Sequence, residues 1–304
     1  YAVLVTAYGG PDSLEDIEPY LLNIRGGRPT PPALVEEVKE RYRLIGGRSP
    51  LPEITRAQAQ ALEARLRAHG EDCRVYVGMR HWHPYIREAV GHIVQDGVRQ
   101  VVALCLAPHY SRMSIGAYFQ EVREAQRELG VDLDVTYVKS WNDHPLLLQA
   151  IAEKVEMGLA HFPEDVRDQV QVLFTAHSLP ARILDQGDPY DAELRETVRG
   201  VVALLSRVPR WRFCYQSAGR SNEPWLGPQI EEVVMELAEA GHKYILVAPI
   251  GFVADQVEVL YDIDIACRKM AADRGAWLER TESLNTSPTF IEALASIVRE
   301  QVNR

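Results

Sequence analysis

A histidine and a tyrosine occupy matching positions in two similar short stretches of the sequence. Residues 173–180 read LFTAHSLP and residues 4–11 read LVTAYGGP, so that four positions are identical and Tyr8 aligns with His177. Both stretches begin as buried β-runs, and the proline that closes each one must end its strand. An imidazole at a strand end can accept a proton or bind a metal at neutral pH, and a phenol can supply an oxygen ligand.

Three carboxylates follow another apolar strand in the segment FVADQVEVLYDID, residues 252–264. Asp255, Glu258 and Asp262 have the spacing i, i+3 and i+7, which places them on one face of an expected helix. Carboxylate oxygens suit divalent cations, and a glutamate near His177 would form an acid/base or metal pair. A helix capping box or a solvated acidic face has the same pattern, so the spacing alone leaves these alternatives open.

Arginines gather in one stretch of an otherwise acidic chain, whose net charge is −10. They lie within and beside the loop-like segments NIRGGRPTPP and IGGRSP, and they are Arg25, Arg28, Arg41, Arg43 and Arg48. Guanidinium groups bind carboxylates and phosphates through paired hydrogen bonds. The alternative is a solvated surface, and Arg41 and Arg43, within one helical segment, cannot both face one ligand. We therefore expect part of the cluster to bind an anionic ligand.

The elements that must position these residues alternate between strands and helices. Short apolar runs predict eight strands: Ala2–Ala7, Cys73–Gly78, Gln100–Ala107, Leu133–Val138, Val170–Thr175, Arg212–Gln216, Lys243–Ala248 and Ala276–Arg280. Amphipathic patterns predict helices between them, including Arg56–Ala68, Ile86–Gln95, Ala192–Ser206, Ile230–Ala240 and Val257–Ala272. This alternation indicates parallel sheets covered by helices, and ligands of such sheets bind beyond the carboxyl ends of the strands.

We expect an α/β fold of two pseudo-symmetric, Rossmann-like halves, each doubly wound around a four-stranded parallel sheet. A second internal match, between LAPHYS (106–111) and VAPIGF (247–252), supports the repeat. The expected halves are 1–150 and 151–304, with the C-terminal helix packing back on the first half. The cleft between the halves is the expected site. The segment MRHWHP (79–84) is expected in its wall, with one of its two histidines facing inward because neighbouring residues alternate in direction.

Composition and missing motifs exclude several classes of function. The acidic charge argues against nucleic acid as a partner, and no apolar run is long enough to predict a membrane span. The glycine motifs of nucleotide-binding folds, the serine-hydrolase elbow and the zincin helix are all absent. Tyr1 leads directly into a strand, so no signal peptide is visible, and the absent initiator Met suggests a trimmed N-terminus. A cytoplasmic location is expected.

The cysteines predict buried free thiols rather than a metal cluster. None of the four is close to another in sequence, and each lies in an apolar segment: Cys73, Cys105, Cys214 and Cys267. This spacing does not support a disulfide framework, a Cys-x-x-Cys site or an iron–sulfur cluster.

An anionic rim, a large flat centre and a divalent metal together describe a tetrapyrrole that carries carboxylates. The chain resembles ferrochelatases over nearly its whole length. The motifs that carry the resemblance are TAYGGP (6–11), RYRLIGGRSPL (41–51), LAPHYS, TAHSLP (175–180), GDPY (187–190), QSAGRSNEPWLGP (216–228) and PIGFVADQVEVLYDID (249–264). The resemblance implies a lyase of haem biosynthesis that inserts Fe²⁺ into a porphyrin held between two Rossmann-like halves.

The chain is most similar to the soluble bacterial coproporphyrin III ferrochelatases, which produce coproheme. Tyr8 stands where enzymes of the protoporphyrin type commonly carry Met or Leu, and the segment NIRGGRPTPPALVEEV is polar where an apolar membrane lip would be. The alternatives are a protoporphyrin IX ferrochelatase, a chelatase for cobalt or another metal, and a non-catalytic haem carrier.

The resemblance also implies roles for particular residues. His177 and Glu258 are the expected catalytic pair, and which of them accepts the proton and which delivers the metal stays open. The expected metal-binding residues are His177, Glu258, Tyr8 and Asp262. Tyr8 is also an expected porphyrin contact, on the face of the ring opposite His177 and Glu258. The expected contacts to the four propionates of coproporphyrin are Arg25, Arg41, Tyr42, Ser49 and Tyr118. Ala266 stands where many relatives continue the carboxylate series with Glu, which puts an outer metal-loading site in doubt.

The expected partners are the porphyrin, ferrous iron as a substrate, and a downstream coproheme decarboxylase. We expect a monomer with no tightly bound cofactor and no iron–sulfur cluster.

Overall fold

The computed structural model describes residues 1–207 and 209–302, and these residues form two parallel sheets of four strands each. Contacts divide the chain into two compact units. Unit 1 is Tyr1–Trp141 with the C-terminal segment that starts at Asn285, and unit 2 is Asn142–Leu284. The division expected after residue 150 falls inside helix α6 (Pro145–Ala160), whereas the observed boundary precedes that helix because α6 packs on elements of unit 2.

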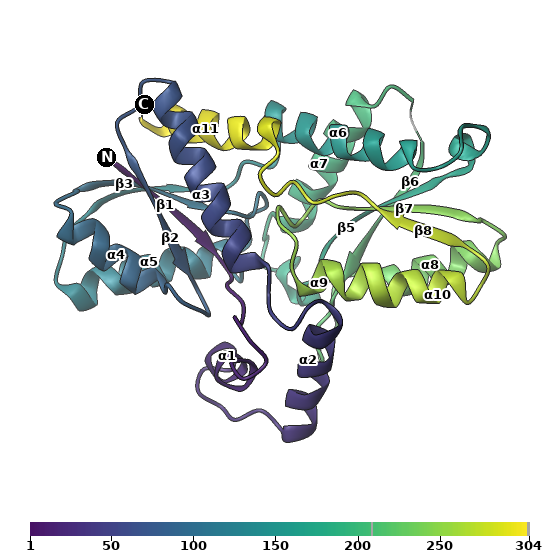
Figure 1. Ribbon diagram of the computed structural model, residues 1–304, viewed down its shortest axis with the longest axis horizontal. Coiled ribbons are helices and arrows are strands. Elements are labelled where there is room, and N and C mark those ends of the chain that lie inside the picture. Colours follow the sequence, from purple (N-terminus) through teal and green to yellow (C-terminus); the bar gives the residue numbers. More distant parts are fainter. Residues whose placement is uncertain (208, 303–304) are drawn as a thin grey trace. The chain divides into compact units, whose positions relative to one another are not determined.

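The sheet of unit 1 has the strand order β2-β1-β3-β4, and every neighbouring pair is parallel. Its strands are β1 (Ala2–Ala7), β2 (Arg74–Met79), β3 (Gln100–Cys105) and β4 (Asp134–Val138). Figure 1 shows helices on both faces of this sheet, namely α3 (Leu51–Ala68), α4 (Ile86–Gln95), α5 (Ile115–Leu129) and α11 (Pro288–Val302). The C-terminal helix α11 packs on α3 and β3. The central strand β1 is buried along its whole length, as expected between two helical layers.

Two further helices of unit 1 lie outside these layers. Helices α1 (Ile17–Ile24) and α2 (Pro32–Leu44) are inserted between β1 and α3 and contact each other (Figure 1). The two glycine pairs that follow them have positive φ angles, which allow the chain to turn sharply; they are Gly26, Gly27, Gly46 and Gly47. The segments expected to be loops in this arginine-rich region are therefore turns that end α1 and α2.

The sheet of unit 2 has the order β6-β5-β7-β8, also with parallel neighbours. Its strands are β5 (Gln171–His177), β6 (Arg210–Gln216), β7 (Tyr244–Pro249) and β8 (Trp277–Arg280). Helices α6, α7 (Tyr190–Leu204) and α8 (Ile230–Glu239) cover it (Figure 1). Unit 2 also contains the shorter helices η1 (Glu164–Gln169) and η2 (Ala181–Ile183). Each strand of this sheet has the position of its counterpart in unit 1. The predicted α/β fold with two doubly wound, four-stranded parallel sheets is confirmed.

The segment after β7 differs from the single helix expected over Val257–Ala272. It consists of α9 (Val257–Leu260), a π-helix η3 (Asp262–Cys267) and α10 (Arg268–Ala272). In the π-helix the Ala266 N–H bonds to the carbonyl of Tyr261 at 2.9 Å, one residue further than in an α-helix. Asp255 lies in the loop before α9, so the expectation that it shares a helix face with Glu258 and Asp262 is wrong. The N-cap residue of α9 also makes no side-chain cap hydrogen bond, which excludes the capping-box alternative there.

The cysteines and the histidines of the segment 79–84 also lie as the sequence predicts. The four cysteines are buried free thiols, as predicted. Of the two histidines in the segment 79–84, His81 is buried and His83 is exposed, which agrees with the expected alternation. Within residues 1–207 and 209–302, no helix has both the length and the apolar character needed to cross a bilayer.

Candidate active site

The central strands of the two sheets end at the two residues that the internal match aligned. In each sheet the chain adds strands first on one side of the central strand and then on the other, so the strand order reverses beside β1 and β5. Ligands of open α/β sheets bind at the carboxyl ends of the strands at this reversal. His177 is the last residue of β5, and Tyr8 follows β1 directly. Both side chains therefore stand where the fold places ligands.

The ring of His177 is held in one tautomer. Its Nδ1 bonds to the carbonyl oxygen of Ser178 at 2.5 Å, and because a carbonyl only accepts, the proton must lie on Nδ1. Burial lowers the pKa of His177, although the Ser178 carbonyl and the Asp262 carboxylate oppose this shift. The imidazole is consequently neutral at pH 7, with the lone pair on Nε2 able to accept a proton or bind a metal.

The backbone at His177 is fixed from three sides. The Ser178 N–H donates to the Gln216 carbonyl at 2.8 Å, and the Tyr190 hydroxyl donates to the His177 carbonyl at 2.9 Å. The loop after β7 approaches so closely that a Cβ atom on Gly251 would lie 2.8 Å from the Cβ of Ala176. This close approach explains why the motif needs a glycine there, and it leaves little freedom for the strand end.

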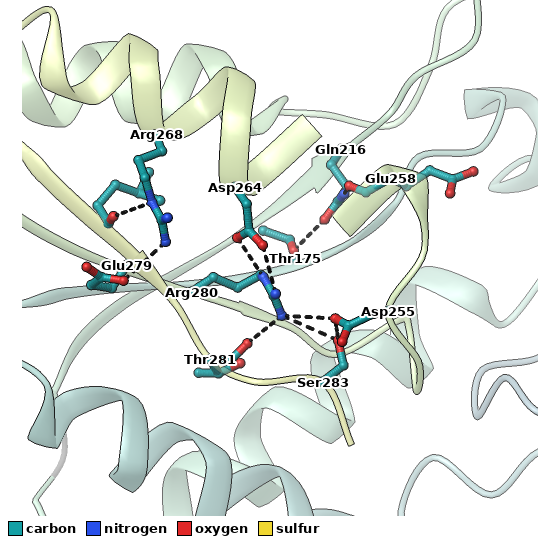
Figure 2. Close-up of polar contacts among 11 residues, drawn as sticks. Thr175, Gln216, Asp255, Glu258, Asp264, Arg268, Glu279, Arg280, Thr281 and Ser283 are labelled. Atoms are coloured by element: carbon teal, nitrogen blue, oxygen red, sulfur yellow. Dashed lines mark hydrogen bonds and ion pairs between the residues drawn. The ribbon is translucent and has the colours of Figure 1, made fainter. Parts of the chain in front are cut away.

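A chain of two hydrogen bonds joins the end of β5 to Glu258 (Figure 2). The Thr175 hydroxyl donates to Oε1 of Gln216 at 2.7 Å, and Nε2 of Gln216 donates to the backbone carbonyl of Glu258 at 2.8 Å. Thr175 and Gln216 are fully buried. Since Thr175 precedes His177 by two residues on the same strand, the chain sets where Glu258 lies relative to the histidine. The Glu258 carboxylate points away from these bonds (Figure 2).

Asp262 begins the π-helix and is bound from the neighbouring strand end. The Ser217 hydroxyl donates to its carboxylate at 2.5 Å, and Ser217 has a φ of 58°, an uncommon angle for a residue other than glycine. Such conformations persist where surrounding contacts impose them, and they cluster at functional sites. His177, Glu258 and Asp262 all lie in unit 2.

No group of three or more His, Cys, Asp or Glu side chains that could hold a metal ion occurs in the part of the chain that the structure describes.

In unit 1, Tyr8 packs against a histidine that is also neutral. The rings of Tyr8 and His81 have centroids 4.5 Å apart, and Nδ1 of His81 bonds to Oδ1 of Asn23 in α1 at 2.7 Å. Burial, with a smaller contribution from Arg80, lowers the pKa of His81 to about 4. These contacts connect the tyrosine at the strand end to helix α1.

The glycines that follow Tyr8 allow close packing of its loop. A Cβ atom on Gly10 would lie 2.3 Å from Oγ of Ser49, and one on Gly9 would lie 2.9 Å from Cβ of Trp82. The Ser49 N–H also donates to the carbonyl of Pro11 at 2.8 Å. The two segments that contain the motifs TAYGGP and RYRLIGGRSPL are therefore in contact within unit 1.

The remaining predicted porphyrin contacts of unit 1 divide into buried and half-buried residues. Tyr42, Ser49 and Tyr118 are buried, and Tyr118 lies in the same apolar cluster against which Tyr8 packs. Arg41, in the last turn of α2, pairs with Glu37 at 2.9 Å and is half-buried. Burial of the aromatic rings leaves the arginines as the more accessible of these residues.

Arg25 has a buried donor that no hydrogen bond from the described residues satisfies. It follows α1 directly, and its Nε is buried without a hydrogen-bond partner among residues 1–207 and 209–302. Buried polar atoms are nearly always hydrogen-bonded in native structures, so an exception calls for an explanation. A carboxylate ligand would satisfy this guanidinium.

The sequence did not reveal the roles of Gln216 and Ser217. Gln216 is the last residue of β6, pairs with His177 across the sheet and is fully buried. In the sequence, its place directly after the apolar run 213–215 was the available signal. Ser217 gave no signal beyond its place in a motif, because its unusual backbone angle is a property of the folded chain.

Comparisons with known proteins show which family this chain resembles. A family model described as ferrochelatase matches residues 1–302. A ferrochelatase of Herpetosiphon aurantiacus is 45% identical over 301 residues, which are 99% of this chain and 98% of that protein. A coproporphyrin III ferrochelatase of Geobacillus kaustophilus is 42% identical over 299 residues, 97% of this chain and 94% of that protein. The sirohydrochlorin chelatase SirB of Bacillus subtilis subspecies spizizenii, solved with cobalt, has the same fold, with a TM-score of 0.57 at 13% identity over 99% of this chain and 95% of that one.

Proposed function

Since the chain belongs to the ferrochelatase family, whose members are lyases that insert iron into a porphyrin, we propose that its substrate is coproporphyrin III and its product coproheme. Two kinds of observation support this porphyrin. The relative from Geobacillus kaustophilus is named for coproporphyrin III. The chain itself carries half-buried arginines beside α1 and α2, where a substrate with four propionates would need cationic partners.

The observation that carries the proposal is the buried Nε of Arg25, which has no hydrogen-bond partner among the described residues. A propionate oxygen would supply the missing acceptor. Arg28, three residues further on, is exposed and already donates to the Arg25 carbonyl at 3.1 Å. Arg25 and Arg28 therefore differ in whether Nε is buried without a hydrogen-bond acceptor, and this is the property that indicates a ligand.

We assign the chemistry of insertion to unit 2. Insertion of Fe²⁺ replaces the two N–H protons of the free-base porphyrin, so both protons must pass to an acceptor or to water. The neutral His177 can accept such a proton on Nε2, since its other nitrogen is already bonded to Ser178. The carboxylates of Glu258 and Asp262 are oxygen ligands of the kind that can bind Fe²⁺ and assist its transfer. In this assignment His177 is the proton acceptor and the two carboxylates handle the metal.

In unit 1, we assign Tyr8 to contact with the macrocycle and with the inserted iron as a weak oxygen ligand. Tyr42, Ser49 and Tyr118 join Arg25 and Arg41 as the proposed porphyrin contacts. Coproheme must lose carboxyl groups from two propionates before it becomes protohaem, so we infer that the product passes to a coproheme decarboxylase. We also infer a cytoplasmic monomer that needs no resident cofactor or iron–sulfur cluster.

Matched arginine variants test the choice of porphyrin. A charge-assisted hydrogen bond to a carboxylate contributes about 1.5–3 kcal/mol, part of which is lost to solvent screening. Arg25→Ala should raise the KM for coproporphyrin III about 10-fold and change that for protoporphyrin IX less, whereas Arg28→Ala should leave both unchanged.

The second pair of variants lies on α2. Arg41→Ala should act like Arg25→Ala, while Arg43→Ala should not, because Arg43 is exposed whereas Arg41 is half-buried. Equal effects of Arg25→Ala and Arg28→Ala on coproporphyrin III would contradict the proposal. The assay is anaerobic formation of the iron porphyrin, followed by absorbance with detergent present in every sample.

A further inference from the structure

Arg280 joins two parts of the chain that are distant in sequence. It is the last residue of β8, and its side chain is only 11% exposed. Nε and one terminal nitrogen donate to the two carboxylate oxygens of Asp264, each at 2.8 Å. The other terminal nitrogen lies 3.4 Å from a carboxylate oxygen of Asp255, to which the Ser283 hydroxyl donates at 2.7 Å. One guanidinium therefore binds two carboxylates (Figure 2).

The two carboxylates stand on either side of the residues assigned to iron handling. Asp255 lies in the loop before α9, and Asp264 lies within the π-helix. Glu258 and Asp262 lie between them in the sequence. Arg280 thus fixes both ends of this segment to the end of a β-strand, which is among the most rigid parts of the fold.

The segment needs such fixing because its own secondary structure is weak. Helix α9 has only four residues, and a helix that short is not stable by itself. The π-helix that follows has a hydrogen-bond pattern that is rare outside functional sites. Contacts on the side of β6 hold the Glu258 carbonyl and the Asp262 carboxylate, through Gln216 and Ser217. Arg280 provides the corresponding contacts on the side of β8.

The charges of this cluster make Arg280 hard to replace. Burial by itself would lower the pKa of Arg280, but Asp264 and Asp255 offset this and leave the pKa above its ordinary value. The guanidinium therefore stays charged. Without it, the half-buried carboxylates of Asp255 and Asp264 would lose the cation that they share, and their mutual repulsion would displace the segment.

We propose that Arg280 is a positioning residue for iron insertion, which binds Asp255 and Asp264 so that the segment between them holds Glu258 in its working position. This inference rests on the proposed role of Glu258. It assigns to Arg280 no contact with porphyrin or iron, so its loss should affect the use of iron and leave porphyrin binding intact.

Arg268 offers a matched control on the same side of the sheet. It pairs with Glu279 at 3.1 Å and donates to the carbonyl of Leu278 at 3.3 Å, so it also ties a helix to β8 (Figure 2). Neither partner lies in the segment from Asp255 to Asp264. If the contacts of Arg280 with its neighbours served only the fold, loss of Arg280 and loss of Arg268 should both leave kcat per binding site unchanged.

The experiment compares Arg280→Lys, Arg280→Met, Asp264→Asn and Arg268→Met with the wild type. Porphyrin-binding sites are counted by titration with metal-free coproporphyrin III. Then kcat per binding site and KM for Fe²⁺ are measured anaerobically, and Tm is measured for each variant. Because kcat is expressed per porphyrin-binding site, unfolded protein does not lower the measured value.

Arg280→Met should lower kcat per porphyrin-binding site by about 10- to 100-fold and raise the KM for Fe²⁺, with porphyrin affinity within about twofold of the wild type. The kcat and the KM for Fe²⁺ of Arg280→Lys should lie between those of the wild type and of Arg280→Met. An ammonium group keeps the charge but cannot bind both oxygens of Asp264 at once as a guanidinium does. Arg268→Met should have a lower Tm than the wild type and an unchanged kcat. If Arg280→Met does not fold, Arg280→Lys and Asp264→Asn provide the same comparison.

The inference is overturned if Arg280→Lys and Asp264→Asn show the kcat and the KM for Fe²⁺ of Arg268→Met. A wild-type enzyme that metallates neither coproporphyrin III nor protoporphyrin IX would contradict the proposed function instead.

Discussion

Replacing Gln216 by leucine tests whether the buried hydrogen bonds in unit 2 serve the chemistry as well as the fold. Leucine fills a similar volume but can neither accept from the Thr175 hydroxyl nor donate to the Glu258 carbonyl. Both bonds are short, at 2.7 Å and 2.8 Å, and Thr175 and Gln216 are fully buried. The substitution therefore removes one hydrogen bond from the buried Thr175 hydroxyl and one from the Glu258 carbonyl.

Loss of each such bond costs about 1–3 kcal/mol, so Gln216→Leu should lower the free energy of unfolding by about 2–6 kcal/mol. This is a large part of the roughly 5–15 kcal/mol that stabilises a typical protein, so the variant should be markedly less stable, and the urea curve gives its folded fraction at 25 °C. Thr175→Val removes only the first bond and should cost about 1–3 kcal/mol. Because the two residues share that bond, the double variant should lose less than the sum of the single losses.

Activity separates the two variants more sharply than stability does. Gln216→Leu releases the Glu258 backbone and should lower kcat per porphyrin-binding site about 10-fold or more, whereas Thr175→Val should lower it less. Urea unfolding gives the stability, and anaerobic metallation gives kcat. If Gln216→Leu loses stability as stated but keeps the wild-type kcat, the idea that this glutamine positions Glu258 is refuted.

The other predictions concern the proposed catalytic pair and the buried histidines. His177→Ala should abolish metallation and leave the affinity for metal-free porphyrin within about twofold, since it removes the acceptor and not the porphyrin contacts of unit 1; a wild-type kcat would exclude the acceptor role. Glu258→Gln keeps the shape but loses charge and basicity, so it should lower kcat strongly at unchanged Tm. A lower Tm with normal turnover would instead indicate a structural glutamate. Burial lowers the pKa of His81 to about 4 and that of His109 to about 3, from an ordinary 6.5. Both are neutral in the folded chain while the unfolded chain binds protons below pH 6.5, so the free energy of unfolding should fall as the pH drops from 6.5 towards 4. An unchanged urea midpoint between pH 7.5 and 5 would contradict this.

Much of the fold follows from local patterns in the sequence. The strand expected at Val170–Thr175 is β5 (Gln171–His177), and the one expected at Arg212–Gln216 is β6 (Arg210–Gln216). Runs of apolar residues identify such buried strands because both of their faces are covered by helices. Their ends are harder to place, since a strand continues for as long as its neighbour offers hydrogen bonds. For that reason His177 belongs to the strand although the apolar run stops before it.

The least predictable part is the segment after β7, which is also the part most closely tied to the proposed chemistry. Its residues have a helical period, so a single helix over Val257–Ala272 was the natural expectation. A π-helix shifts the phase of the turns without changing the local composition, and so leaves no periodic signal. The position of Asp255 in the loop before α9 has a different reason: its partners, Arg280 and Ser283, lie at and just after the end of β8, and local patterns do not encode such distant contacts.

The boundary between the two units is also hard to predict from the sequence. A division of the sequence near its middle follows from the count of strands in each half. We expect from the sequence that the C-terminal helix packs on the first half, and α11 does contact α3 and β3. The boundary after Trp141, instead of after residue 150, depends on the packing of α6, which local patterns do not encode.

The most direct test of the account is a comparison of two porphyrins under identical anaerobic conditions. Wild-type enzyme is mixed with Fe²⁺ and either coproporphyrin III or protoporphyrin IX, with detergent in both samples to prevent aggregation, and kcat/KM is obtained from the absorbance of the product. Loss of two propionate contacts should lower kcat/KM about 10-fold or more, so coproporphyrin III should be preferred by at least that factor. Equal kcat/KM for the two porphyrins would contradict the account, and would leave a ferrochelatase whose half-buried arginines have another purpose.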